Sequence, residues 1–178
     1  MRQKIKSGLD LWFLNKFNEV YFSSRLNKSR FHIQHGDTSC LLHSIAVAYI
    51  SYRIASYLKF LKFKNEELVR GALLHDYFLY DWHDRGAAIK LHGFFHPRHA
   101  LENAQADFEL SKVERDIILK HMFPLTILPP RYKESMLVSF VDKLCSVYET
   151  FKRGAYRNRQ ICHLYHMSKS GDKALCLV

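Results

Sequence analysis

The stretch Gly71-Ala72-Leu73-Leu74-His75-Asp76 ends an apolar run with an imidazole next to a carboxylate. Upstream of it, Asn65 can cap a helix, and Glu66 and Glu67 follow where the dipole of a first turn favours anions. The sequence therefore predicts a buried helix from Asn65 to the His75-Asp76 pair. An imidazole and a carboxylate removed from water need partners. A metal ion satisfies both, because it binds neutral histidine nitrogen and carboxylate oxygen together.

The rest of the chain is also helical in pattern. Apolar residues recur at steps of three and four, whereas strand patterning is weak throughout. Thr38 or Ser39 can cap a second helix, and Ser111 with Glu114 forms a capping box for another. The predicted helices are 8–26, 40–60, 65–76, 97–107 with Pro97 in its first turn, 112–121 and 132–153. Residues 77–95 are expected to be irregular, and prolines predict a loop over 123–131. We predict an all-α single domain, a bundle of about six helices.

Charge is distributed unevenly along the 178 residues, which carry 27 Lys and Arg against 17 Asp and Glu, a net of +10. Residues 1–30 hold seven Lys and Arg against two acidic residues, and residues 151–178 hold six against one. The middle of the chain is therefore neutral. We predict a basic N-terminal helical segment over 1–30 packed on the domain, the domain itself over 31–153, and a basic C-terminal tail over 154–178. The basic ends lack zinc-finger spacing and aromatic RNA-binding motifs, so we expect no nucleic-acid partner.

Several other protein classes are not expected. No stretch approaches the roughly 20 consecutive apolar residues of a membrane span. The N-terminus shows no small-residue cleavage site, so we expect no secretory signal. The four cysteines form no CxxC pair, and free thiols favour a cytoplasmic protein over a disulfide framework or a cysteine zinc site. The seven glycines do not form a phosphate-binding loop.

Other metal-ligand candidates lie at broad intervals from the His75-Asp76 pair. They are His43, His96, His121 and Asp142. Each interval is about one helix plus one loop, so each residue can project from a different helix into one cavity, as in the metal sites of helical bundles. Each also has an ordinary explanation on its own, such as a hydrogen-bonded core histidine, a cation at a helix C-terminus or a salt bridge. Taken in order, the set predicts a shared site.

This order, H…HD…H…H…D, resembles the HD superfamily of metal-dependent phosphohydrolases over about residues 35–148. The two intervening histidines are similar to the extra ligands of HD enzymes that hold two metals, which include HD-GYP cyclic-dinucleotide phosphodiesterases and HD-type diadenosine tetraphosphate hydrolases. The stretch GALLHDYFLYDWH is similar to small bacterial HD proteins. Leu79 stands where many relatives have a lysine, and the GYP signature is absent, so a cyclic-dinucleotide substrate is not expected. His99 competes with His96, which we prefer because the HPxxA spacing fits the family pattern.

The resemblance implies a dinuclear site of divalent transition metals, namely iron, manganese, zinc or nickel. Asp76 would lie between the metals, with His43, His75 and Asp142 on one and His96 and His121 on the other. With Asp76 and His75 as catalytic residues, such a site activates water to hydrolyse a nucleotide or a related small phosphate ester. Adjacency in sequence makes five residues candidates for substrate binding: Arg85, Arg98, His99, Lys120 and Lys143. The alternative is an HD-fold module that binds a nucleotide without turnover, and di-iron oxygenase chemistry of distant relatives is a further option.

Overall fold

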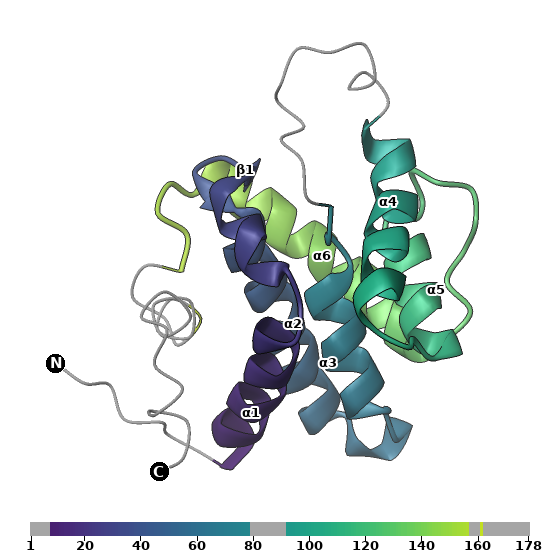
Figure 1. The fold of residues 1–178 in the computed structure, drawn as a ribbon. Helices are drawn as coiled ribbons and strands as arrows, with labels where there is room; N and C mark the ends of the chain where they lie inside the picture. Colours follow the sequence, from purple (N-terminus) through teal and green to yellow (C-terminus); the bar gives the residue numbers. More distant parts are fainter. Residues whose placement is uncertain (1–7, 79–91, 157–160, 162–178) are drawn as a thin grey trace, which may run out of the picture.

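Helices α2 (Cys40–Tyr57) and α3 (Asn65–Leu74) form the centre of the fold in this computed structural model, which describes residues 8–78, 92–156 and 161 (Figure 1). Helix α2 packs against α3 and α6 (Lys133–Phe151), and α3 packs against α5 (Lys112–Lys120). Helix α4 (His92–Asp107) contacts α5, and α1 (Gly8–Phe22) lies against α3. The all-α fold predicted from the sequence is confirmed.

Short elements connect these helices. A 3-10 helix, η1 (Leu26–Phe31), follows α1, and a second one, η2 (Lys59–Leu61), follows α2. Strands β1 (Ile33–His35) and β2 (Thr38–Ser39) form a two-stranded antiparallel hairpin before α2. The weak strand pattern did not predict this hairpin, whose turn depends on Gly36 at φ +58°.

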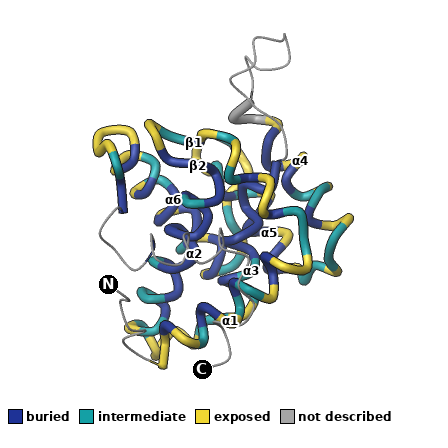
Figure 2. Tube along the Cα trace, turned by 60° about the vertical axis from the view of Figure 1, so that its left-hand side comes forward, coloured by how far each residue is buried: buried dark blue, intermediate teal, exposed yellow. Residues whose placement is uncertain are grey.

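The core lies between the helices, and Figure 2 shows the buried segments running through the middle of the trace. Helix α1 contributes Phe13, Leu14 and Phe17, each at most 1% exposed. Full burial of one such side chain stabilises the fold by about 1.5–3 kcal/mol. Gly71 brings α3 close to α5, since a Cβ at this position would lie 2.6 Å from the Cδ1 of Ile117.

Two helix starts match the predicted capping residues, and one does not. The hydroxyl of Ser39 accepts a hydrogen bond from the Leu42 amide at 3.3 Å, and Ser111 with Glu114 forms the predicted capping box. Asn65 was predicted to cap α3, but it is the first residue within the helix. The carboxylate of Glu134 on α6 instead accepts from the preceding amide, that of Lys64, at 2.9 Å. A contact 70 residues away in sequence thus fixes this helix end.

Other boundaries also differ from the prediction. Helix α1 ends at Phe22 instead of residue 26. Helix α4 begins at His92, so the prediction of Pro97 in a first turn was wrong. Inside a helix, proline removes one intrahelical hydrogen bond, and here the packing of α4 overrides that local preference. Residues 123–131 contain no helix, as predicted.

Packed residues continue past Gly154, where the predicted C-terminal tail begins. Ala155, Tyr156 and Ile161 are each at most 5% exposed and belong to the hydrophobic core. In the N-terminal segment, Arg25 follows α1 and pairs with Asp107 at 3.1 Å.

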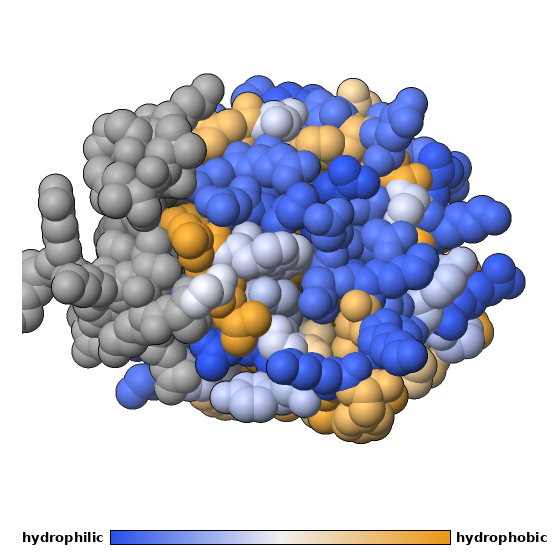
Figure 3. Space-filling view, turned by 90° about the horizontal axis from the view of Figure 1, so that it is seen from below, coloured by the Kyte–Doolittle hydropathy of each residue, from blue (hydrophilic) through white to orange (hydrophobic). Residues whose placement is uncertain are grey.

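Polar side chains cover most of the centre of the face seen from below (Figure 3). None of the helices within the described ranges is long and apolar enough to cross a membrane.

Candidate metal centre

The fold brings six predicted ligands into one buried cluster. His43 lies in the first turn of α2, and His75 is the C-terminal cap of α3, with Asp76 directly after it. His96 lies on α4, His121 caps the end of α5, and Asp142 lies in the middle of α6. All six are at most 5% exposed. Five helices therefore meet at one point through residues spread over 100 positions of the sequence.

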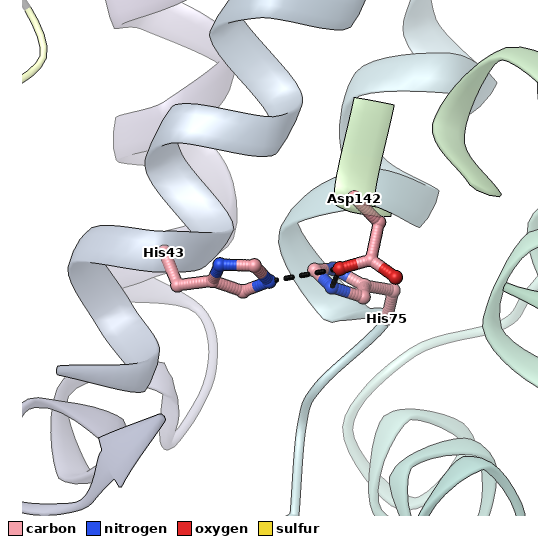
Figure 4. A group of neighbouring side chains, drawn as sticks. All are labelled: His43, His75 and Asp142. Atoms are coloured by element: carbon pink, nitrogen blue, oxygen red, sulfur yellow. Dashed lines mark hydrogen bonds and ion pairs between the residues drawn. The ribbon is translucent and has the colours of Figure 1, made fainter. Parts of the chain in front are cut away.

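Three of these residues form a first group that is suited to hold a metal ion: His43, His75 and Asp142. Figure 4 shows their side chains pointing toward one another from α2, the end of α3 and α6. The Oδ1 of Asp142 lies 3.1 Å from the Nε2 of His43 and 3.6 Å from the Nε2 of His75. The donor atoms of the group all lie within 4.8 Å of one another.

A second group with the same property consists of His75, Asp76 and His121, and His96 adjoins it. The Oδ1 of Asp76 lies 3.2 Å from the Nε2 of His96 and 3.5 Å from the Nε2 of His121. Its other oxygen, Oδ2, lies 3.4 Å from the Nε2 of His75 and 3.7 Å from the Nε2 of His43. The two oxygens of Asp76 thus face different sets of imidazoles.

Backbone carbonyls orient two of the imidazoles. The Nδ1 of His75 lies 2.7 Å from the carbonyl oxygen of Ala72, and the Nδ1 of His121 lies 2.8 Å from that of Ile118. Because a carbonyl only accepts, each Nδ1 must donate its hydrogen there. In a neutral ring the Nε2 lone pair is then directed into the cluster, which is the arrangement that metal-binding histidines adopt.

Glu149 orients the imidazole of His43 in the same way, and the sequence did not predict its role. The Nδ1 of His43 donates to the Oε2 of Glu149 at 2.8 Å, and the hydroxyl of Tyr156 donates to Oε1 at 2.9 Å. The signal was present in the spacing, because Glu149 follows Asp142 by seven residues and two helical turns place both on one face of α6. Gln34 was also missed; its amide donates to the Oδ2 of Asp76 at 2.6 Å.

Charge interactions outweigh the effect of burial at the two aspartates and at His43, whereas burial lowers the pKa of His121. Burial alone would raise the pKa of Asp76, but His75, His121 and His96 hold that pKa well below its usual value. Burial would lower the pKa of His43, but Glu149 and Asp142 raise it well above its usual value. The pKa of Asp142 is lowered against burial in the same way, chiefly by His43 and His75. The aspartates are therefore ionised at neutral pH, as metal binding requires.

A family comparison agrees with this geometry. The family model of the HD domain matches residues 41–146, which include all six clustered residues. The chain belongs to the HD domain family. HD domains are generally metal-dependent phosphohydrolases, although some members are not catalytic. The searches of curated proteins and of solved structures gave no match.

The cluster of this HD domain fits a divalent metal ion. The Nε2 of His75 and the Oδ1 of Asp76 are buried; among the described residues each has ionisable neighbours, but neither makes a hydrogen bond. Such atoms cost free energy unless something satisfies them. The Nε2 atoms of His96 and His121 also face each other at 2.8 Å. The donor set of histidine nitrogens and carboxylate oxygens suits transition metals.

The predicted substrate-binding residues of this HD domain differ in whether they lie near the metal cluster. The Nζ of Lys143 lies 3.6 Å from the Oδ2 of Asp142, beside the cluster. Lys120 instead pairs with Asp116 at 2.6 Å. Arg98 and His99 are exposed and both pair with Glu102, whereas His96 is buried in the cluster. Arg85 lies outside the described residues.

Proposed function

We propose that this HD domain is a metal-dependent phosphohydrolase that acts on a nucleotide or a related small phosphate ester and uses two divalent transition metals, iron, manganese, zinc or nickel. The position of Asp76 carries the proposal. Its Oδ1 faces His96 and His121, whereas its Oδ2 faces His75 and His43. Only a carboxylate can offer one oxygen to each of two cations. His43, His75 and Asp142 would complete one metal site, and His96 and His121 the other.

Bound metals of this kind lower the pKa of a coordinated water and neutralise phosphoryl charge. The chain itself supplies the positions and the surroundings. The carbonyls of Ala72 and Ile118 and the carboxylate of Glu149 each hold one Nδ1 hydrogen, which keeps the imidazoles from rotating. Burial of the cluster keeps the local dielectric low, so charge interactions with a phosphate are stronger than in water.

Lys143 supports the substrate part of the proposal. Its ammonium group is half-buried and donates to the carbonyl of His121 at 2.5 Å, so it is held beside Asp142. An ammonium group in this position can neutralise a phosphoryl oxygen as negative charge develops. Burial lowers the pKa of Lys143. We assign Lys143 as the residue that contacts the phosphate. Three other expectations stay predictions: the substrate roles of Arg85, Arg98, His99 and Lys120, the cytoplasmic location, and the absence of a nucleic-acid partner.

Metal analysis and a phosphatase screen test this function. The protein is purified without added metal, its metal content is measured, and phosphate esters are screened with Mn²⁺ and Fe²⁺. We expect two metals per chain and hydrolysis that Asp76→Asn abolishes, while Glu102→Gln on the exposed side of α4 changes neither. Two bound metals without turnover of any ester, together with nucleotide binding, would favour a non-catalytic binding module. Protein that binds no metal would contradict the proposal altogether.

A further inference from the structure

A pocket of about 470 Å³ lies between the loop after α5 and helix α6. Among the described residues that line it, most are apolar: Phe123, Pro124, Pro129, Pro130, Met136 and Phe140. Only Ser139 and Lys143 add polar groups to this lining. The volume falls within the range of about 300–1,000 Å³ of small-molecule sites, which combine apolar walls with a few polar groups in this way.

Two polar residues of the pocket lining, Ser139 and Lys143, contact residues of the metal cluster. The hydroxyl of Ser139 donates to the carbonyl of His121 at 2.8 Å, and the ammonium of Lys143 donates to the same carbonyl at 2.5 Å. The ammonium also lies 3.6 Å from the Oδ2 of Asp142. Lys143 therefore belongs both to the pocket lining and to the immediate surroundings of a candidate metal ligand. A molecule in the pocket that contacts Lys143 therefore lies beside a candidate metal ligand.

The walls of the pocket leave flat and polarisable apolar surface uncovered. Phe140 is 60% exposed, Met136 is 61% exposed and Phe123 is 37% exposed. Aromatic rings favour stacked or edge-to-face contacts with other rings, and methionine sulfur packs well at ring edges. This combination suits a planar ring, and the ammonium group of Lys143 beside the cluster suits an anion attached to that ring.

We propose that this pocket binds the nucleobase of a nucleotide substrate, with the phosphate lying between Lys143 and the metal cluster. The phosphate part rests on the proposed function, whereas the base part rests on the pocket alone. Phe140 and Met136 would then determine specificity, because they favour a phosphate ester that carries an aromatic ring over one that carries a small polyol.

Binding is tested first, without turnover. Protein labelled with ¹³C at the methionine methyl groups is stripped of metal with chelator and titrated with adenosine 5′-monophosphate. We expect a ring-current shift of the Met136 methyl signal, which is assigned with Met136→Leu. Phe140→Ala is expected to weaken this binding about tenfold. Leu144→Ala, one turn further along α6 and 52% exposed but outside the pocket lining, is the matched control and should leave binding unchanged.

Turnover then tests specificity in metal-loaded protein. We expect kcat/KM for adenosine 5′-monophosphate, divided by kcat/KM for glycerol phosphate, to fall about tenfold in Phe140→Ala and to stay unchanged in Leu144→Ala. Hydrolysis of the nucleotide without any shift at Met136 would overturn the pocket assignment and leave the proposed function standing. A Met136 shift without hydrolysis of any ester would support the pocket and refute the proposed function. A Met136 signal that responds to protein concentration instead of nucleotide would identify a contact between two copies of the chain and overturn the assignment.

Discussion

Replacing Glu149 with glutamine removes one charge from the buried environment of His43 and changes almost nothing in shape. Glu149 is 1% exposed and accepts two hydrogen bonds, from His43 Nδ1 at 2.8 Å and from the Tyr156 hydroxyl at 2.9 Å. A glutamine amide has only one oxygen, and its NH₂ group cannot accept. One of the two donors must then lose its partner or its geometry. Glu149→Gln therefore perturbs both the orientation of His43 and the packing of Tyr156.

The size of the effect follows from these two contacts. Loss of a residue that orients a metal ligand costs about 10–100-fold in metal affinity, which corresponds to roughly 1.4–2.7 kcal/mol. A buried donor left without an acceptor costs about 1–3 kcal/mol. We expect metal affinity to fall by 10–100-fold and the metal-free protein to lose about 1–3 kcal/mol of unfolding free energy.

Competition with a chromophoric chelator measures the metal affinity, and urea unfolding in EDTA measures the stability of the metal-free protein. Glu102→Gln is the control, since it makes the same chemical change on the exposed surface of α4, where effects stay within about 0.5 kcal/mol. Wild-type metal affinity in Glu149→Gln would refute the reasoning that this carboxylate positions His43. An equal loss in Glu102→Gln would show that the effect is general.

Three further predictions follow from single features. The raised pKa of His43 stabilises the metal-free protein fully below pH 6.5, and this stabilisation is lost as pH rises through the folded-state pKa. Thermal melts in EDTA should therefore give a falling Tm above pH 6.5, and a flat Tm would contradict this. Metal affinity should increase over the same pH range, because binding needs neutral imidazole. Gly71→Ala places a methyl group against Ile117 and should cost about 1–3 kcal/mol in urea unfolding, whereas Gly8→Ala, with open space around it, should show no such loss. Ser111→Ala removes the acceptor of the α5 capping box and should cost about 1 kcal/mol; an unchanged urea midpoint would show that this cap contributes nothing.

The sequence predicted the helices and the ordered ligands because both depend on local pattern. Apolar spacing identified α2 and α6, and the capping box located the start of α5. The clustered set was recognisable from the order of its members along the chain, and the resemblance to the HD superfamily supported His96 and His121 as additional ligands. Intervals of one helix plus one loop then placed the set at a common point. These signals require no knowledge of how the helices pack.

The missed features depend on packing between distant parts of the chain. From the sequence, Glu149 is indistinguishable from an acidic residue on a helix surface. Its partner, His43, lies 106 residues earlier in the chain and contacts it only in the folded protein. Gln34 meets Asp76 only after the β1–β2 hairpin has folded onto the helices. The start of α3 depends on Glu134, so Asn65, the stronger capping residue by type, does not cap it. Local propensity cannot reveal such contacts.

The clustered residues come from α2, α4, α6 and the ends of α3 and α5, so two bound metals would together cross-link all five helices. Binding to the folded state alone adds about 2.7 kcal/mol of stability when free metal is 100 times its Kd. Thermal unfolding would then report metal occupancy directly, even in a variant with no turnover. An HD domain that had lost its chemistry would therefore still depend on the same six side chains to hold its helices together.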